Sequence, residues 1–218
     1  SLAASRLERS SRRTQRAPVA PSPPALELTP TTDAERAVVA RADERALPQH
    51  LRMGLTLAAM RAHVEALPTD VVAQCNDAIP KDARGAPMYL TNGVLNGYVN
   101  QFAIKRSHPS ESVCERLLRQ GSSQVGLAKA FVSFALGCEM ETLLDAIRCY
   151  LEQASLPKDT KFWVCDFVIR QGDADLRDVP RLGDCVYAVH HTVLLMEPWC
   201  SRIKPTSPSH QPMSPSHQ

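Results

Sequence analysis

The order of apolar runs and helical stripes in the C-terminal half most constrains how this chain can fold. Three short apolar segments, at 128–136, 161–169 and 192–197, have the pattern of strands that are covered on both faces. Two segments with helical periodicity, at 138–154 and 178–189, separate them. Strands that alternate with helices over short links form parallel sheets with right-handed crossovers. The sequence therefore predicts an α/β fold with a parallel three-stranded sheet and crossover helices.

The two crossover helices differ in how clear their apolar faces are. The segment 138–154 has the most regular stripe in the chain, and Glu139 and Glu141 suit the positive end of its dipole. For the segment 178–189 we expect Leu182, Val186 and Val189 to face inward. The stripe of the first helix consists of Met140, Leu143, Leu144, Ile147 and Leu151.

Residues 33–122 read as a helical region. A Thr/Asp cap opens a helix within 31–46, and Thr69-Asp70 caps a short helix that ends before Pro80. The segment 107–120 reads as a helix with a Ser cap. Between the first two lies one stripe at helical spacing, which predicts a further helix. That stripe consists of Met53, Leu57, Met60, Val64 and Leu67.

The segment 88–104 admits two interpretations. It contains Asn-Gly twice, a strong signal for a β-hairpin, but only Val94 and Leu95 would remain between the two turns. As a helix it places Gly93 and Gly97 on one face, where a neighbour could approach closely. We favour the helix, with an apolar row on it formed by Leu95, Tyr98 and Phe102.

The two ends of the chain have compositions that do not support a core. Residues 1–32 carry five Arg, many Ser and Pro, and residues 204–218 repeat SPSHQ, so we expect both to be disordered. The remaining units are the helical region 33–122 and an α/β domain at 125–203. The net charge of +2 does not favour nucleic acid as a partner. No apolar run is long enough to span a bilayer. We expect a cytoplasmic protein, with organelle targeting by the Arg/Ser-rich start as the alternative.

The seven cysteines are scattered and form no CxxC pair. A structural zinc site needs closely spaced ligand pairs, so we expect no metal and no cofactor from the residues themselves. Small buried thiols in a reducing compartment fit the pattern better. A redox or metal protein that uses these cysteines is the weaker alternative.

Candidate site residues follow from the expected sheet. In an open parallel sheet, ligands bind beyond the carboxyl ends of the strands, which brings the three loops at those ends together. The first loop lacks the glycine pattern of a phosphate-binding turn, so a dinucleotide or P-loop site is not expected. Polar and aromatic groups on these loops suit a small pocket. They are Ser133, Cys138, Asp166, Gln171, Glu197 and Trp199.

The second half resembles a TIR-like domain, related to the Toll/interleukin receptor and heterokaryon-incompatibility types, in a form found in large protist and algal gene sets. The resemblance rests on a series of motifs along residues 110–202. These are SESVCE (110–115), VGLAKA (125–130), FVSFAL (131–136), WVCDFVIRQ (163–171) and LGDCVYAVHHTVLLMEPW (182–199). The last motif is the most specific. The resemblance implies a flavodoxin-like parallel sheet, of which this chain holds only part.

The chain also departs from that family pattern. The His and Trp of the family's S-H-A-W are Phe134 and Leu136 here. In members that cleave NAD, a catalytic glutamate lies on a later W-C-x-x-E helix. No residue matches it, because after Ile203-Lys204 the sequence enters the SPSHQ repeat. We therefore expect an incomplete domain with no catalytic residue, in which NAD is implied by the resemblance alone.

Three functions compete on these grounds. The first is a TIR-like interaction or signalling module without catalysis, which binds a protein partner or itself through its sheet edge or its helices. The second is an enzyme that cleaves NAD or a related nucleotide, with Glu197 or Asp166 in place of the missing glutamate. The third is a gene fragment with no function of its own. Three strands with two helices leave one edge and part of one face uncovered, which is an aggregation hazard unless the helical first half or a partner chain covers the gap.

Overall fold

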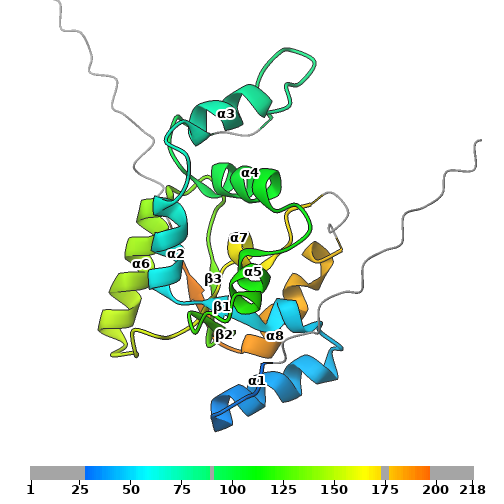
Figure 1. The fold of residues 1–218 in the computed structure, drawn as a ribbon, viewed down its shortest axis with the longest axis vertical. Helices are drawn as coiled ribbons and strands as arrows, with labels where there is room; N and C mark the ends of the chain where they lie inside the picture. Colours follow the sequence, from blue (N-terminus) through cyan, green and yellow to red (C-terminus); the bar gives the residue numbers. More distant parts are fainter. Residues whose placement is uncertain (1–27, 89–90, 173–176, 197–218) are drawn as a thin grey trace, which may run out of the picture.

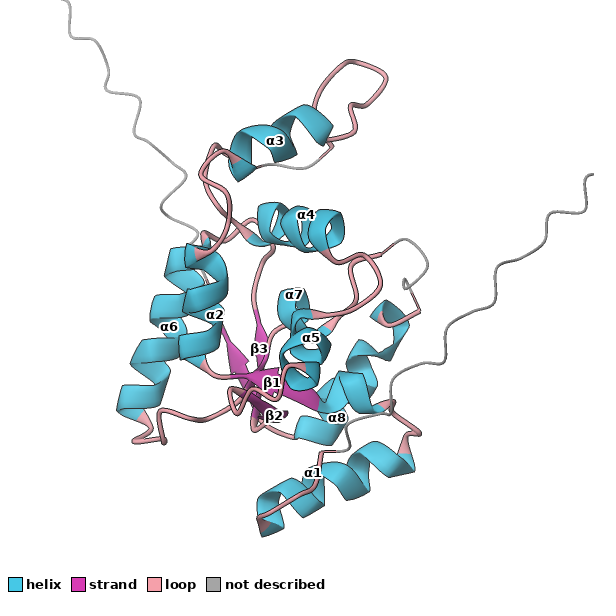
Figure 2. Cartoon of the chain, viewed as in Figure 1, coloured by secondary structure: helices cyan, strands magenta, loops and turns pink. Residues whose placement is uncertain are grey.

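A computed structural model describes residues 28–88, 91–172 and 177–196. Over these residues the chain forms eight α-helices around one five-stranded mixed sheet (Figures 1 and 2). The strands are β1 (Met53–Leu55), β2 (Val125–Leu127), β3 (Ala130–Ser133), β4 (Phe162–Trp163) and β5 (Thr192–Leu194). The helices are α1 (Asp33–Glu44), α2 (Leu57–Glu65), α3 (Val71–Ala78), α4 (Gly97–Ser107), α5 (Val113–Arg119), α6 (Met140–Gln153), α7 (Cys165–Val168) and α8 (Leu182–Val189). None of the described helices is long and apolar enough to cross a membrane.

The predicted parallel unit is present as β4-β3-β5, with β3 in the middle. Phe131 lies opposite Trp163 on one side and Thr192 on the other, both in parallel register. Helix α6 connects β3 to β4, and α8 precedes β5, as the alternation predicts. The apolar face predicted for α6 is confirmed, since all five of its residues are buried.

The second predicted strand, 161–169, is wrong beyond Trp163. The chain turns into α7, where the amides of Phe167 and Val168 donate to the carbonyl of Val164. Buried polar contacts to Asp166, described below, hold this turn against the strand preference of its apolar residues. Secondary-structure preference is a weak prior that tertiary contacts override.

The sheet also includes two strands that the sequence did not reveal. β1 lies inside the region predicted to be helical, so Met53 belongs to a strand, and the helix of that stripe begins at Leu57. β1 pairs antiparallel with β2 and with β4, where Leu55 is opposite Phe162. The helical region therefore contributes a strand to the interior of the sheet.

Gly54 allows this close pairing. A Cβ at position 54 would lie 2.7 Å from the carbonyl oxygen of Phe162 and 3.1 Å from the Cβ of Ala128. Its partner across the β1–β2 pair is Gly126, where a Cβ would meet only the flexible side chain of Lys161 at 3.4 Å. Trp163 Nε1 donates to the carbonyl of Leu51 at 2.9 Å and adds a second link between the two halves.

Helices pack on both sides of this sheet in Figure 1. On one side α2 and α6 lie together, joined by hydrogen bonds from Arg61 to Glu141 and Asp145. On the other side α1 packs along α8, and Arg41 Nε donates to the carbonyl of Ala188 at 2.9 Å. α1 starts where its capping signal predicts, because Thr32 and Glu35 form a capping box.

The two Asn-Gly pairs of the segment 88–104 have different structures. Asn92 and Gly93 both have positive φ, and Val94 N donates to the carbonyl of Thr91 at 3.0 Å, so the first pair forms a turn. Asn96 instead caps α4, which begins at Gly97. The predicted helix is thus right from residue 97 and wrong before it. Its predicted row is right only in part, because Leu95 precedes the helix while Phe102 packs half-buried against the core. The fully buried face of α4 consists of Gly97, Val99, Asn100, Ala103 and Ile104.

Two further predictions of burial are wrong in part or whole. On α8, Val189 is buried and Leu182 packs half-buried against the core as predicted, but Val186 is exposed. β5, predicted to be covered on both faces, is an edge strand in which Thr192 and Leu194 are exposed and Val193 is half-buried. The predicted disordered tails lie outside the described residues, apart from 28–32.

We expect Gly54→Ala to lower the free energy of unfolding by about 2–3 kcal/mol, because the new methyl group meets backbone atoms that cannot move aside. Gly126→Ala is the matched control, since it makes the same change at the paired position against a flexible side chain. Chemical denaturation of both variants measures the difference. Equal destabilisation would show that the β1–β4 contact does not have this geometry.

Candidate functional site

Four of the six predicted site residues lie in the described part of the chain. Ser133 ends β3, and Cys138 is buried just before α6, where its Sγ donates to the carbonyl of Glu139 at 3.4 Å. Asp166 lies in α7, and Gln171 follows it. Glu197 and Trp199 lie outside the described residues.

Helix α4 covers the edge where the site was predicted. Its start packs on the loop between β3 and α6: Asn96 and Glu139 form a β-bridge, and a Cβ at Gly97 would lie 3.0 Å from the carbonyl oxygen of Leu136. In Figure 2, α4 lies beyond the tip of β3 and over α7. A helix of the N-terminal half thus occupies the place where a ligand would bind in an open parallel sheet.

Asp166 is fully buried beneath α4, and two amide side chains of α4 bind its carboxyl group. Gln101 Nε2 donates to one carboxyl oxygen at 2.7 Å, and Asn100 Nδ2 donates to the other at 3.2 Å. Burial raises the pKa of Asp166 to about 6, although these hydrogen bonds oppose part of the rise. Gln171 Nε2 donates to the backbone carbonyls of Ile169 and Asp166, which closes the turn after α7.

The polar contacts continue from Asn100 to α2. His63 Nε2 lies 3.0 Å from Asn100 Oδ1, and its ring meets Phe167 edge-on at 5.3 Å. Because Asn100 uses its amide protons on Asp166, its oxygen accepts from His63. This arrangement fixes the orientation of His63 and joins α2, α4 and α7. Sequence reasoning missed Asn100 and Gln101, although two adjacent amides in a largely apolar helix are a signal for such a buried contact.

Two thiols, one on α7 and one on α8, are poor nucleophiles. Burial and the neighbouring Asp166 raise the pKa of Cys165 well above its usual range, so the thiol stays protonated. Burial likewise raises the pKa of Cys185 to about 12. These environments fit the prediction of small buried thiols. Among the described residues, no group of three His, Cys, Asp or Glu side chains could hold a metal ion.

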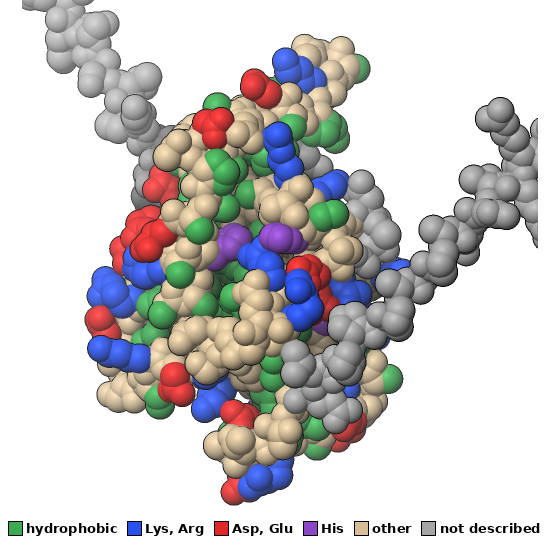
Figure 3. Space-filling model, in the orientation of Figure 1, with side chains coloured by type: hydrophobic (Ala, Val, Ile, Leu, Met, Phe, Trp, Pro, Cys, Tyr) green, Lys and Arg blue, Asp and Glu red, His purple; other side chains and the backbone are tan. Residues whose placement is uncertain are grey.

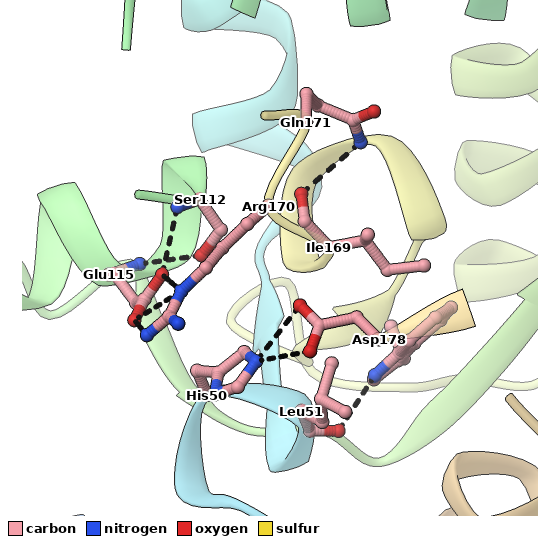
Figure 4. A network of polar contacts seen from close by, with 9 residues as sticks. His50, Leu51, Ser112, Glu115, Ile169, Arg170, Gln171 and Asp178 are labelled. Carbon is pink, nitrogen blue, oxygen red and sulfur yellow. Dashed lines mark hydrogen bonds and ion pairs between the residues drawn. The ribbon is translucent and has the colours of Figure 1, made fainter. Parts of the chain in front are cut away.

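A second polar network, which sequence reasoning also missed, lies between α5 and the turns on either side of the sheet (Figure 4). Glu115 caps its own helix through the amide of Ser112 and accepts three hydrogen bonds from Arg170, at 2.5, 2.9 and 3.2 Å. Burial alone would raise the pKa of Glu115, but the hydrogen bonds from Arg170 and Ser112 outweigh it and lower that pKa. The Ser-x-x-Glu spacing was visible in the sequence, whereas the partner 55 residues away was not.

In the same network His50 Nε2 donates to both carboxyl oxygens of Asp178, each at 3.0 Å. The two side chains are 12% and 11% exposed, so this pair is shielded from water. The pair joins the 3-10 turn Gln49–Arg52 to the turn before α8, 128 residues later in the chain. The pair therefore links the N-terminal half of the protein to the C-terminal half.

Comparisons of the chain with protein-family models, with curated proteins and with solved structures found no match. The TIR-like resemblance therefore stays an expectation from the sequence motifs.

We expect Asp166→Asn to remove one pH dependence of stability. A carboxyl with a raised pKa in the folded state stabilises the fold below its unfolded pKa, and this stabilisation is lost as the pH rises through the folded pKa. The pKa of Asp166 rises from 3.8 to about 6 on folding. Relative to the variant, the wild type therefore loses on the order of 2–3 kcal/mol of unfolding free energy as the pH rises through this range.

Chemical denaturation of both proteins at about pH 4 and at about pH 7 measures this difference. The effect of Glu115, whose pKa is lowered, is common to both proteins and cancels. If the difference in unfolding free energy between wild type and variant is the same at both pH values, Asp166 is not buried as described.

Proposed function

We propose that this chain is a TIR-like interaction module that acts by self-association, without catalysis, and that its contact surface is the open edge and face of β5. The observation that carries the proposal is the exposure of large apolar side chains on this edge strand. Leu194 is 63% exposed and Met196 is 71% exposed. Exposed apolar residues that gather on an unpaired strand are typical of interaction sites.

The two faces of β5 differ sharply. Successive side chains of a strand point to opposite faces, so Val193 and Leu195 share one face, and Leu194 and Met196 share the other. Val193 and Leu195 pack against the core. Nothing among the described residues covers Leu194 and Met196 to a comparable extent. The uncovered face is therefore confined to the side of the strand that points away from the core.

No other strand of the described residues pairs with the second edge of β5. Leu195 N donates to the carbonyl of Ser133, and His191 O accepts from Phe131 N, so odd-numbered residues of this segment bond to β3. By the alternation of a strand, the backbone groups of Thr192 and Leu194 point to the open edge. A second copy could pair its own β5 there across a two-fold axis, which would extend the sheet and bury both apolar faces.

The geometry of the carboxyl edge weighs against the NAD-cleaving alternative. Asp166, the described residue that could replace the missing glutamate, is fully buried beneath α4 with its carboxyl oxygens already bonded to Asn100 and Gln101. A catalytic carboxylate must reach its substrate. Consumption of NAD by the full chain that is lost in Asp166→Asn, with folding retained, would overturn this part of the proposal.

We expect the wild-type chain to dimerise with rising concentration in the micromolar range, and the double variant Leu194→Lys/Met196→Lys to stay monomeric, because two charges on the apolar face oppose its burial. Sedimentation velocity measures the shift. Met88→Lys is the control, since Met88 is 61% exposed on a loop away from β5. A wild-type chain that is monomeric throughout, or equal effects of the control and of the double variant, would contradict the proposal.

A further inference from the structure

A second concave site lies on the helical side of the molecule, between α2, α3, α4 and α5. Its volume is about 490 Å³, which is within the range of small-molecule pockets. Its apolar wall includes Leu67, Val71 and Phe102. Its polar wall carries two arginines and two histidines, from α2, α4, α5 and the residue after α4. They are His63, Arg106, His108 and Arg116.

The charges on this wall have one sign. None of the described residues that line the cavity is Asp or Glu. Figure 3 shows histidine side chains beside Lys or Arg side chains on this face. Cations that converge on a cavity repel one another, and an anion between them relieves that repulsion.

Arg116 is the centre of this arrangement. Its side chain is half-buried, and no hydrogen bond or ion pair holds its guanidinium among the described residues. Burial lowers the pKa of Arg116, Glu111 opposes this from a distance, and Arg119 adds repulsion. Glu111 is engaged elsewhere, because Arg119 Nη2 donates to both of its carboxyl oxygens at 2.7 and 2.8 Å. An arginine that is desolvated without a bonded carboxylate has donors available for a ligand.

The other three polar side chains are held in place around it. His63 is oriented by its hydrogen bond to Asn100. Arg106 Nη1 donates to Gln74 Oε1 at 2.9 Å, which holds that side chain at the wall of the cavity. His108 Nδ1 lies 3.9 Å from Glu111 Oε1. Burial lowers the pKa of His63, and the charges of Arg116 and His108 lower it further, so these groups act on one another across the cavity.

We propose that this cavity binds a small phosphate monoester, with the phosphate on Arg116 and His108 and the organic group against Phe102, Leu67 and Val71. Guanidinium groups bind phosphate oxygens through two parallel hydrogen bonds, and imidazole adds single donors at fixed positions. The apolar wall supplies the contact that distinguishes an organic phosphate from inorganic phosphate. This site is separate from the β5 surface, and binding there requires no catalytic step.

Isothermal titration calorimetry of the full chain with phenyl phosphate, inorganic phosphate and phenol tests the proposal. We expect saturable binding of phenyl phosphate, weaker binding of inorganic phosphate and none of phenol. Arg116→Gln should lower the affinity for phenyl phosphate at least about tenfold, the loss typical of removing a charged donor pair. His108→Gln should weaken it less, and both variants are first checked for wild-type thermal stability.

The matched control is Arg148→Gln on α6. It removes one positive charge from an exposed arginine that pairs with Glu152 and does not line the cavity. Its affinity should equal that of wild type. The proposal is overturned if no probe saturates, if phenol binds as well as phenyl phosphate, or if Arg148→Gln weakens binding as much as Arg116→Gln. If Arg116→Gln is unstable, loss of phenyl phosphate binding in His108→Gln supports the site, and unchanged binding overturns it.

Discussion

The insertion of β1 between β2 and β4 is the contact on which the rest of the structure depends. It places the backbone of Gly54 directly against Phe162. Just before the strand, the carbonyl of Leu51 accepts a hydrogen bond from Trp163 Nε1. Without β1, the parallel unit would lose the neighbour that covers its β4 edge, and a fragment that lacked the first hundred residues would expose it. The N-terminal helices are thus a structural part of the α/β unit, and the chain boundary near residue 122 is not a boundary of the sheet.

This arrangement also determines where function can lie. Because the N-terminal half enters the sheet, its helix α4 lies over the carboxyl ends of the parallel strands and encloses Asp166 with Asn100 and Gln101. The usual ligand site of an open parallel sheet is thereby filled by the protein itself. Two other surfaces of the described residues are candidates: the β5 edge with its exposed Leu194 and Met196, and the cationic cavity around Arg116. The proposed self-association and the proposed phosphate site follow from these two surfaces.

The parts of the fold that sequence revealed are those with long local patterns. The stripe of α6 and the alternation that produces β4-β3-β5 each span several residues of clear periodicity, and the start of α1 follows from its predicted cap. β1 and β2 are three residues each, too short for a pattern, and they are paired by contacts some 70 residues apart in sequence. The burial of β5 was overestimated because an apolar run shows that a strand prefers to be covered, not that a neighbour covers it.

The candidate site was only partly visible for the same reason. Asp166 was identified from its place after a strand, but its partners on α4 lie 65 and 66 residues away, and the Arg116 cavity joins four separate helices. Hydrogen exchange on the full chain, followed peptide by peptide at rising denaturant, tests the central claim most directly. We expect 53–55 to gain and lose protection together with 130–133 and 162–163, as one cooperative unit. If 53–55 exchanges at once while the other two segments stay protected, the helical half does not belong to the sheet.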